Sequence, residues 1–227
     1  MDNDHRQEAT DFLATYITEH KKNLMESVLA QRTRFVTVAL EDIYQPHNAS
    51  AVVRTADCFG IQEVHIIEGR NKYDTNPQVL RGSEKWIDII KHGDEDNNTK
   101  SCFDALKKRG YKLIGTTPHT DGISLPEIKI DQPIALIFGT EETGLSEYAM
   151  EHVDEHLRIP MYGFTESFNL SVSAAISLYQ IMTDLHTSNL DYHLSEEEKR
   201  DIRLSWYRKV VRRAEALEKE HFVHRNN

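Results

Sequence analysis

The side chains best suited to bind or transform a ligand lie in a polar loop that follows residue 160. A short apolar segment ends at Pro160, and the loop after it carries Ser167 and Asn169. A helix then opens with the small residues 171–175. Because small side chains let a second backbone or a flat ligand approach closely, this stretch predicts a strand, a binding loop and a tightly packed helix.

A second polar loop, residues 139–144, follows the most apolar segment of the chain. Its glycine spacing matches the start of a phosphate-binding loop, but Leu145 and Ser146 stand where that loop requires Lys and Ser or Thr, which excludes an ATPase of this kind. A dinucleotide-binding Gly-x-Gly-x-x-Gly that opens a helix is also missing. The adjacent carboxylates Glu141 and Glu142 could bind a ligand, and a simple polar turn explains the segment about as well.

A third cluster runs from Asn48 to Arg54. Asn48 stands where a helix cap is expected. Arg54 lies six residues later among small and apolar side chains, where a guanidinium requires an anionic partner or ligand. An arginine that extends along its stem to solvent is the competing interpretation.

The last predicted helix carries a local excess of positive charge in an otherwise acidic chain. Only Asp201 opposes the basic residues between 199 and 213, and these residues wrap more than half of a helix. This pattern favours contact with phosphates over an ordinary solvated face, and it predicts that Trp206 packs rather than stacks on a base. The basic residues are Lys199, Arg200, Arg203, Arg208, Lys209, Arg212 and Arg213.

The elements that would position these residues alternate between strands and helices, which predicts an α/β domain with a mostly parallel sheet. Ligands of such sheets bind at the carboxyl ends of the strands, so the loops after the strands should line one crevice. We expect an N-terminal helical extension over 1–33, the α/β domain over 34–190, and a basic helical extension over 191–227. Expected strands are 34–40, 63–67, 86–90, 111–116, 134–138 and 156–160. Expected helices are 49–59, 100–109, 146–152, 169–186 and one running from a capping box at Ser195 to about residue 221.

Bulk properties limit the class of protein. The 227 residues carry a net charge of −10, which argues against indiscriminate nucleic-acid binding. No apolar run is long enough to span a bilayer, and the N-terminus lacks the pattern of a signal peptide. Two cysteines cannot make a disulfide framework or a four-cysteine zinc site, so we expect reduced thiols in a cytoplasmic protein.

Taken together, the three polar clusters resemble the SpoU/TrmH family of SPOUT RNA methyltransferases. Three family motifs occur in order, each after a predicted strand: residues 48–60, residues 137–145, and residues 159–174. The match covers about residues 34–188. The flanking extensions are most similar to those of the branch that methylates the 2′-hydroxyl of a tRNA guanosine, at position 18 in the D-loop.

The resemblance implies a C-terminal trefoil knot, a homodimer with the active site at the subunit interface, tRNA as the partner, and S-adenosylmethionine as the methyl donor, which leaves as S-adenosylhomocysteine. The sulfonium methyl is already electrophilic, so no metal is expected. The implied cofactor-binding residues are Thr116, Leu136, Phe138, Gly139, Gly144, Ile159, Met161, Phe168 and Leu170. The implied RNA-binding residues are Arg200, Arg203, Arg208, Arg212 and Arg213.

The resemblance also implies roles for the catalytic residues Arg54, Asn48, Glu141, Ser167 and Asn169. Since a guanidinium stays protonated, we assign Arg54 to phosphate binding and to stabilising negative charge on the ribose oxygen rather than to base catalysis. Asn48 would orient the arginine or the ribose. Glu141 would hold the site together, although the neighbouring Glu142 leaves open which carboxylate acts. Ser167 and Asn169 would lie near substrate and cofactor.

Three alternatives stay open at this point. The enzyme could methylate ribosomal RNA or another tRNA position. The chain could be a catalytically silent RNA-binding module of the same fold, although the motif residues are all present. A flavodoxin-like small-ligand protein explains the sheet, but it explains neither the three motifs nor the basic tail.

Overall fold

The computed structural model describes residues 3–118 and 122–225 of the chain. It divides into two compact units, an α/β unit over Thr33–Tyr192 and a helical unit that combines the residues up to Arg32 with those from His193 onward. The two terminal segments, which are far apart in the sequence, therefore belong to one helical unit. No helix within the described residues is both long and apolar enough to cross a membrane.

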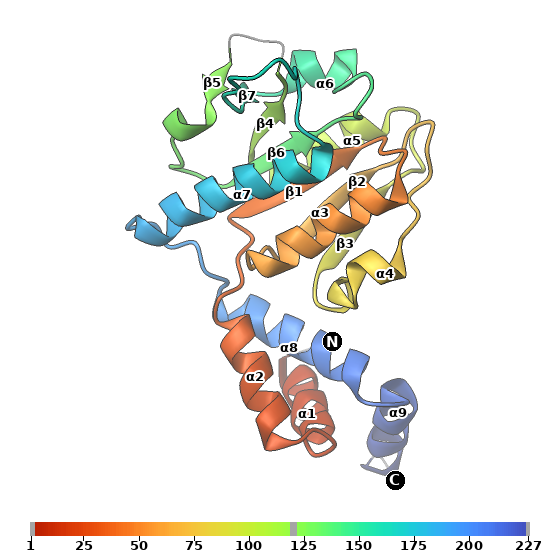
Figure 1. The fold of residues 1–227 in the computed structure, drawn as a ribbon. Helices are drawn as coiled ribbons and strands as arrows, with labels where there is room; N and C mark the ends of the chain where they lie inside the picture. Colours follow the sequence, from red (N-terminus) through yellow and green to blue (C-terminus); the bar gives the residue numbers. More distant parts are fainter. Residues whose placement is uncertain (1–2, 119–121, 226–227) are drawn as a thin grey trace. The chain divides into compact units, whose positions relative to one another are not determined.

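The α/β unit is built on a seven-stranded sheet in the order β3-β2-β1-β6-β4-β7-β5, in which every pairing is parallel (Figure 1). This confirms the predicted α/β class. β6 and β1 are buried along their whole length in the middle of the sheet, as expected for parallel strands covered on both faces. The strands are β1 (Val36–Glu41), β2 (Glu63–Ile67), β3 (Asp88–His92), β4 (Lys112–Thr116), β5 (Ile123–Ser124), β6 (Ile134–Phe138) and β7 (Glu155–Arg158).

Helices cover both faces of this sheet (Figure 1). α3 (Pro46–Cys58) and α7 (Leu170–Thr187) lie against each other on one face and supply Val52, Val53 and Leu178 to the larger core cluster. α5 (Asn98–Lys108) and α6 (Glu147–His152) supply the smaller cluster on the other face. Shorter elements are α4 (Pro77–Leu80) and the 3-10 turns Ser83–Lys85 and Leu125–Glu127. The first of these turns occupies the residues just before Trp86, so the third strand starts later than predicted.

Both terminal segments contain a break that the sequence pattern did not predict. At the N-terminus, α1 (Asn3–Ala14) ends and Thr18 caps a separate α2 (Glu19–Leu29). At the C-terminus, α8 (Glu196–Val210) and α9 (Ala214–Arg225) replace the single predicted helix. The chain turns where Arg213 adopts a left-handed conformation, with φ at 61°. The predicted capping box at Ser195 is confirmed.

The structure shows which apolar side chains of the helical unit are buried. Trp206 is buried, which confirms its role as a packing residue, and the Arg32 guanidinium lies 5.4 Å from the centre of its ring. On α2, Met25 and Leu29 are buried, whereas Leu24 and Val28 are exposed.

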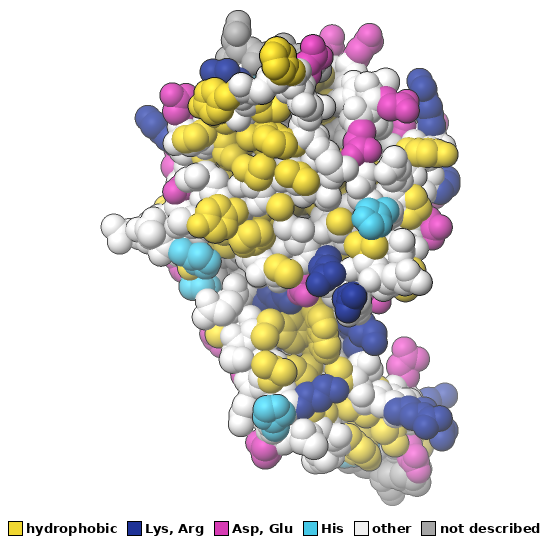
Figure 2. Space-filling model, viewed as in Figure 1, with side chains coloured by type: hydrophobic (Ala, Val, Ile, Leu, Met, Phe, Trp, Pro, Cys, Tyr) yellow, Lys and Arg dark blue, Asp and Glu magenta, His cyan; other side chains and the backbone are white. Residues whose placement is uncertain are grey.

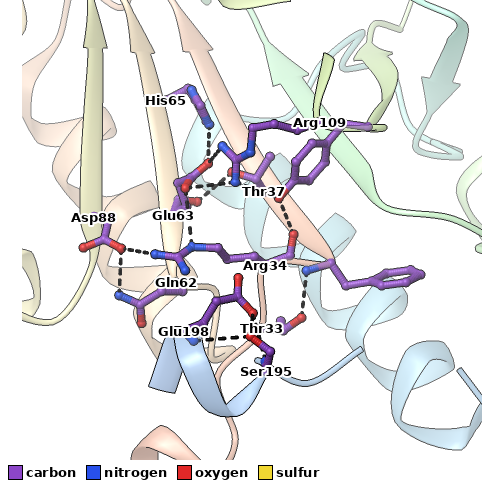
Figure 3. A network of polar contacts seen from close by, with 12 residues as sticks. Thr33, Arg34, Thr37, Gln62, Glu63, His65, Asp88, Arg109, Ser195 and Glu198 are labelled. Atoms are coloured by element: carbon purple, nitrogen blue, oxygen red, sulfur yellow. Dashed lines mark hydrogen bonds and ion pairs between the residues drawn. The ribbon is translucent and has the colours of Figure 1, made fainter. Parts of the chain in front are cut away.

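A network of charged side chains lies on the sheet around the buried Glu63 (Figure 3). Its carboxylate accepts hydrogen bonds from His65 and Arg109, and Arg34 lies 3.5 Å away. Burial raises the pKa of Glu63, but the hydrogen bonds from His65 and Arg109 outweigh this effect and lower the pKa to about 2. The two cysteines are free, and burial raises the pKa of the Cys102 thiol.

Candidate active site

A pocket of about 300 Å³ opens at the carboxyl edge of the sheet, where β4, β6 and β7 end. Its walls come from the three loops that follow these strands, as the parallel topology predicts. The pocket brings together eight of the nine predicted cofactor residues: Thr116, Phe138, Gly139, Gly144, Ile159, Met161, Phe168 and Leu170. The ninth, Leu136, lies inside β6 with its side chain buried in the core.

The loop after β6 closes on itself, and this closure explains its two glycines. Thr140 and Gly144 exchange backbone hydrogen bonds of 2.9 and 3.0 Å. A Cβ atom on Gly139 would lie only 2.2 Å from the backbone of Gly144, so no other residue fits there without a shift. Gly144 itself has φ at 69°, a left-handed conformation that favours glycine. The glycines therefore shape the rim of the pocket through the backbone.

A hydrogen-bonded network joins the three polar clusters beside this pocket. The Asn169 side-chain amide donates to Glu141 Oε1 at 2.6 Å and to Asn48 Oδ1 at 3.3 Å. Its oxygen accepts from the backbone of Ser171 and Val172, so Asn169 is also the N-cap of α7. Asn169 thus connects its own loop to Glu141 and to Asn48, and it fixes the start of α7.

The two neighbouring carboxylates differ in position. Glu141 accepts from Asn169 and, at 3.4 Å, from the backbone of Leu170. Glu142 lines the pocket and has no hydrogen bond recorded among the described residues. The geometry therefore selects Glu141 as the carboxylate of the network. Ser167 is exposed and lines the same pocket.

Arg54 lies apart from this network. It is exposed on α3, and its guanidinium donates a long hydrogen bond of 3.5 Å to the backbone carbonyl of Val79. It does not line the pocket. Asn48, by contrast, is buried at the start of the same helix and faces Asn169. Within one chain, the predicted catalytic residues are therefore only partly assembled.

The predicted RNA-binding arginines belong to the helical unit, and two of them are engaged within it. Arg203 makes a two-pronged ion pair with Glu26 of α2, at 2.5 and 2.7 Å. Arg208 does the same with Glu218 of α9, at 2.9 and 2.7 Å. These glutamate partners lie on other helices, so the sequence around each arginine does not predict them. Exposed guanidinium groups are those of Arg200, Arg212 and Arg213.

Sequence reasoning missed one residue that shapes the site. Glu41, at the end of β1, is buried and accepts hydrogen bonds from Thr99 Oγ1 at 2.6 Å and from Ser146 Oγ at 2.7 Å. Ser146 is the N-cap of α6. Through Ser146, Glu41 therefore holds the chain in place just after the 139–144 loop. A carboxylate that ends an otherwise uncharged strand is the signal that could have revealed it.

The fold and the pocket define an α/β protein with a ligand site at the carboxyl edge of a parallel sheet. The chain belongs to the SpoU rRNA Methylase family, whose model matches residues 35–179. A tRNA (guanosine(18)-2′-O)-methyltransferase of Borreliella burgdorferi is 42% identical over 91% of this chain and 93% of its own length.

Two solved structures extend the comparison. The TrmH/SpoU tRNA modifying enzyme of A. aeolicus is 29% identical and superposes with a TM-score of 0.75 over 86% of this chain and 98% of its own. The SpoU methyltransferase AviRb of Streptomyces viridochromogenes, solved in complex with AdoMet, is 23% identical with a TM-score of 0.60, over 71% of this chain and 65% of its own. The second likeness concerns the fold alone.

Proposed function

We propose that this protein is a tRNA (guanosine(18)-2′-O)-methyltransferase that uses S-adenosylmethionine. The observation that carries this assignment is the 42% identity to a relative of that activity over nearly the whole of both chains. The helical unit is included in this match, so the similarity is not limited to the family domain. Methylation of ribosomal RNA, or of another tRNA position, is the competing activity.

The pocket fits the cofactor chemically. Phe138, Leu157 and Ile159 give it an apolar wall suited to an adenine ring, and backbone groups of the surrounding loops lie at its rim. Glu141 and Glu142 place negative charge near the pocket, which suits a sulfonium and an ammonium group. When bound, S-adenosylmethionine supplies an electrophilic methyl group.

The residues of the chain then have positioning and electrostatic roles. Asn169 holds Glu141 and Asn48 in one arrangement at the mouth of the pocket. Arg54 binds the phosphate next to the target ribose and stabilises the charge that develops on its 2′-oxygen. Holding the hydroxyl and the methyl group in line is the main task, because well-oriented pairs gain roughly 7–11 kcal/mol over free reactants.

A homodimer would complete this site. Arg54 is exposed and does not line the pocket of its own chain. Large apolar side chains are also exposed on α7 and before it, where hydrophobic atoms gather in Figure 2. They are Tyr162, Phe164, Phe168, Val172 and Tyr179. We propose that this face pairs two copies, so that Arg54 of one subunit serves the pocket of the other. The knot and the cytoplasmic location stay predictions.

The activity is tested with two matched tRNA transcripts that differ at one atom. The protein is incubated with methyl-labelled S-adenosylmethionine and either unmodified tRNA or the same tRNA with a 2′-deoxyguanosine at position 18. Label should enter the first RNA and not the second. Equal labelling of both, or labelling of ribosomal RNA alone, would contradict the proposed substrate.

The shared site is tested by mixing two inactive variants. Arg54→Ala and Glu141→Gln proteins are each expected to lose methyl transfer. If the site combines residues of two subunits, unfolding and refolding them together produces heterodimers with one intact site, and activity returns. If the mixture stays inactive although heterodimers form, both residues act within one chain.

A further inference from the structure

A cluster of potential metal ligands lies on the half of the sheet away from the pocket. His65 is on β2 and His92 is on the neighbouring β3. In the register of these strands, His92 pairs with Ile67, two residues beyond His65, so both imidazoles are on one face of the sheet. Cys102 is on α5, which packs on β2 and β3. All three side chains therefore come from rigid elements, and none lines the pocket.

The ligand atoms are close enough to share one cation. His65 Nδ1 and His92 Nε2 are 3.0 Å apart. One ring nitrogen of each histidine and Cys102 Sγ all lie within 4.8 Å of one another. From Zn–N and Zn–S bonds of about 2.05 and 2.3 Å, tetrahedral coordination needs nitrogens about 3.3 Å apart and sulfur about 3.6 Å from each. Side-chain rotations that move the ligand atoms by a few tenths of an ångström to about 1 Å would bring them to these distances.

The surroundings of His65 resemble those of a metal ligand. Its Nε2 is 2.7 Å from Glu63 Oε1, and Arg109 donates a hydrogen bond to the same oxygen (Figure 3). When Nε2–H donates to Glu63, the lone pair of Nδ1 points toward His92. A carboxylate behind a ligating histidine fixes its tautomer and raises its basicity, which is the usual outer shell of protein metal sites.

A hydrogen bond between two core histidines is the simpler interpretation of the 3.0 Å contact. It explains the two rings, but it assigns no role to the buried thiol beside them. Two imidazoles and a thiolate are ligands that Zn²⁺ prefers in proteins. His92 is half-buried, so water can reach a fourth position.

We propose that His65, His92 and Cys102 bind a divalent cation of the Zn²⁺ class. On binding, His65 Nδ1 coordinates directly, and His92 shifts its proton from Nε2 to Nδ1. Cys102 releases its proton to solvent, so one proton leaves for each cation. The cation would tie α5 to the β2–β3 edge of the sheet. This inference does not depend on the methyltransferase activity.

The test uses the full-length protein after treatment with a chelator. Addition of Co²⁺ alone should give tetrahedral visible bands and a thiolate-to-cobalt charge-transfer band that saturates at one ion per chain. Zn²⁺ alone should displace the cobalt and raise the melting temperature. Cys102→Ser should lose the charge-transfer band. Cys58→Ser, which changes the exposed cysteine, is the matched control and should keep it.

Two further variants guard against misfolding. His92→Asn changes the most accessible ligand and should weaken cobalt binding at least tenfold. Glu63→Gln keeps all three ligands and should weaken it about tenfold through the outer shell alone. Circular dichroism without metal confirms that each variant is folded. The proposal is overturned if the wild-type protein shows no charge-transfer band, or if Cys102→Ser binds cobalt with the same spectrum.

Discussion

Asn169 allows the stability of α7 to be separated from the orientation of Glu141, the carboxylate we propose for the active site. Its oxygen caps the helix, and its amide nitrogen donates to Glu141 at 2.6 Å. The substitution Asn169→Asp keeps a good N-cap, and its negative charge at a helix N-terminus is favourable. It replaces the donated hydrogen bond with two facing carboxylates. The fold should therefore tolerate this change, whereas the site should not.

The structure sets the size of both effects. A hydrogen bond to a charged group contributes about 1.5–3 kcal/mol, and about 1.4 kcal/mol corresponds to a factor of ten in rate. Loss of the oriented Glu141 should lower kcat/KM for tRNA methylation by roughly ten- to 150-fold. Because the site is exposed, solvent screens the repulsion, and the free energy of unfolding should change by less than about 1 kcal/mol. Asn169→Ala, which also removes the cap, should lose about 1 kcal/mol more.

Initial rates with unmodified tRNA and urea unfolding curves measure the two quantities on the same preparations. Asn169→Asp is expected to be slow but stable, and Asn169→Ala slow and less stable. The reasoning is refuted if Asn169→Asp methylates at the wild-type rate, because the link to Glu141 would then have no role in catalysis. It is also refuted if both variants are equally destabilised, because the cap would then not distinguish them.

Three other substitutions test separate parts of the structure. Gly139→Ala should abolish S-adenosylmethionine binding in a calorimetric titration while the protein stays folded, because the added Cβ would lie 2.2 Å from the far end of the same loop. Arg208→Ala should lower the free energy of unfolding by about 3 kcal/mol, measured by urea denaturation, because it leaves the buried Glu218 without its partner. Arg212→Ala combined with Arg213→Ala should leave the free energy of unfolding nearly unchanged but weaken tRNA binding. The slope of log K against log salt concentration should become shallower, by the equivalent of up to about two phosphate contacts. An unchanged slope would exclude these side chains from the RNA interface.

Six of the seven strands were predictable, with shifted ends in several cases, because local sequence favours them; the two-residue β5 (Ile123–Ser124) was not predicted. Residues 134–138 are a purely apolar run between Pro133 and Gly139, and the structure gives β6 the same bounds. Parallel pairing and the crevice at the carboxyl ends followed from the alternation of strands and helices. The two unexpected breaks depend instead on contacts within the helical unit. A left-handed Arg213 has no signature in the sequence, since glycine is the usual residue in that conformation.

The site shows the same division. The loops and their polar residues were identified in the sequence, and most of the predicted cofactor residues line one pocket. Which side chains contact one another could not be predicted, because Asn48 and Asn169 are 121 positions apart and meet only through the packing of α3 against α7. Likewise, only the position of Asn169 shows that Glu141 is the carboxylate bonded to it, and a catalytic role for Glu141 stays a prediction.

The ion pairs of the helical unit also affect how an acidic chain can bind RNA. Arg203 and Arg208 are neutralised by Glu26 and Glu218, so the basic tail offers fewer free charges than its sequence contains. Each phosphate contact adds a fixed increment to the salt dependence of binding. A tail with few exposed guanidinium groups therefore predicts a shallow salt slope, and specificity for one guanosine must come from the site at the sheet edge. A steep slope that persists after Arg212 and Arg213 are replaced would place the RNA on the α/β unit instead.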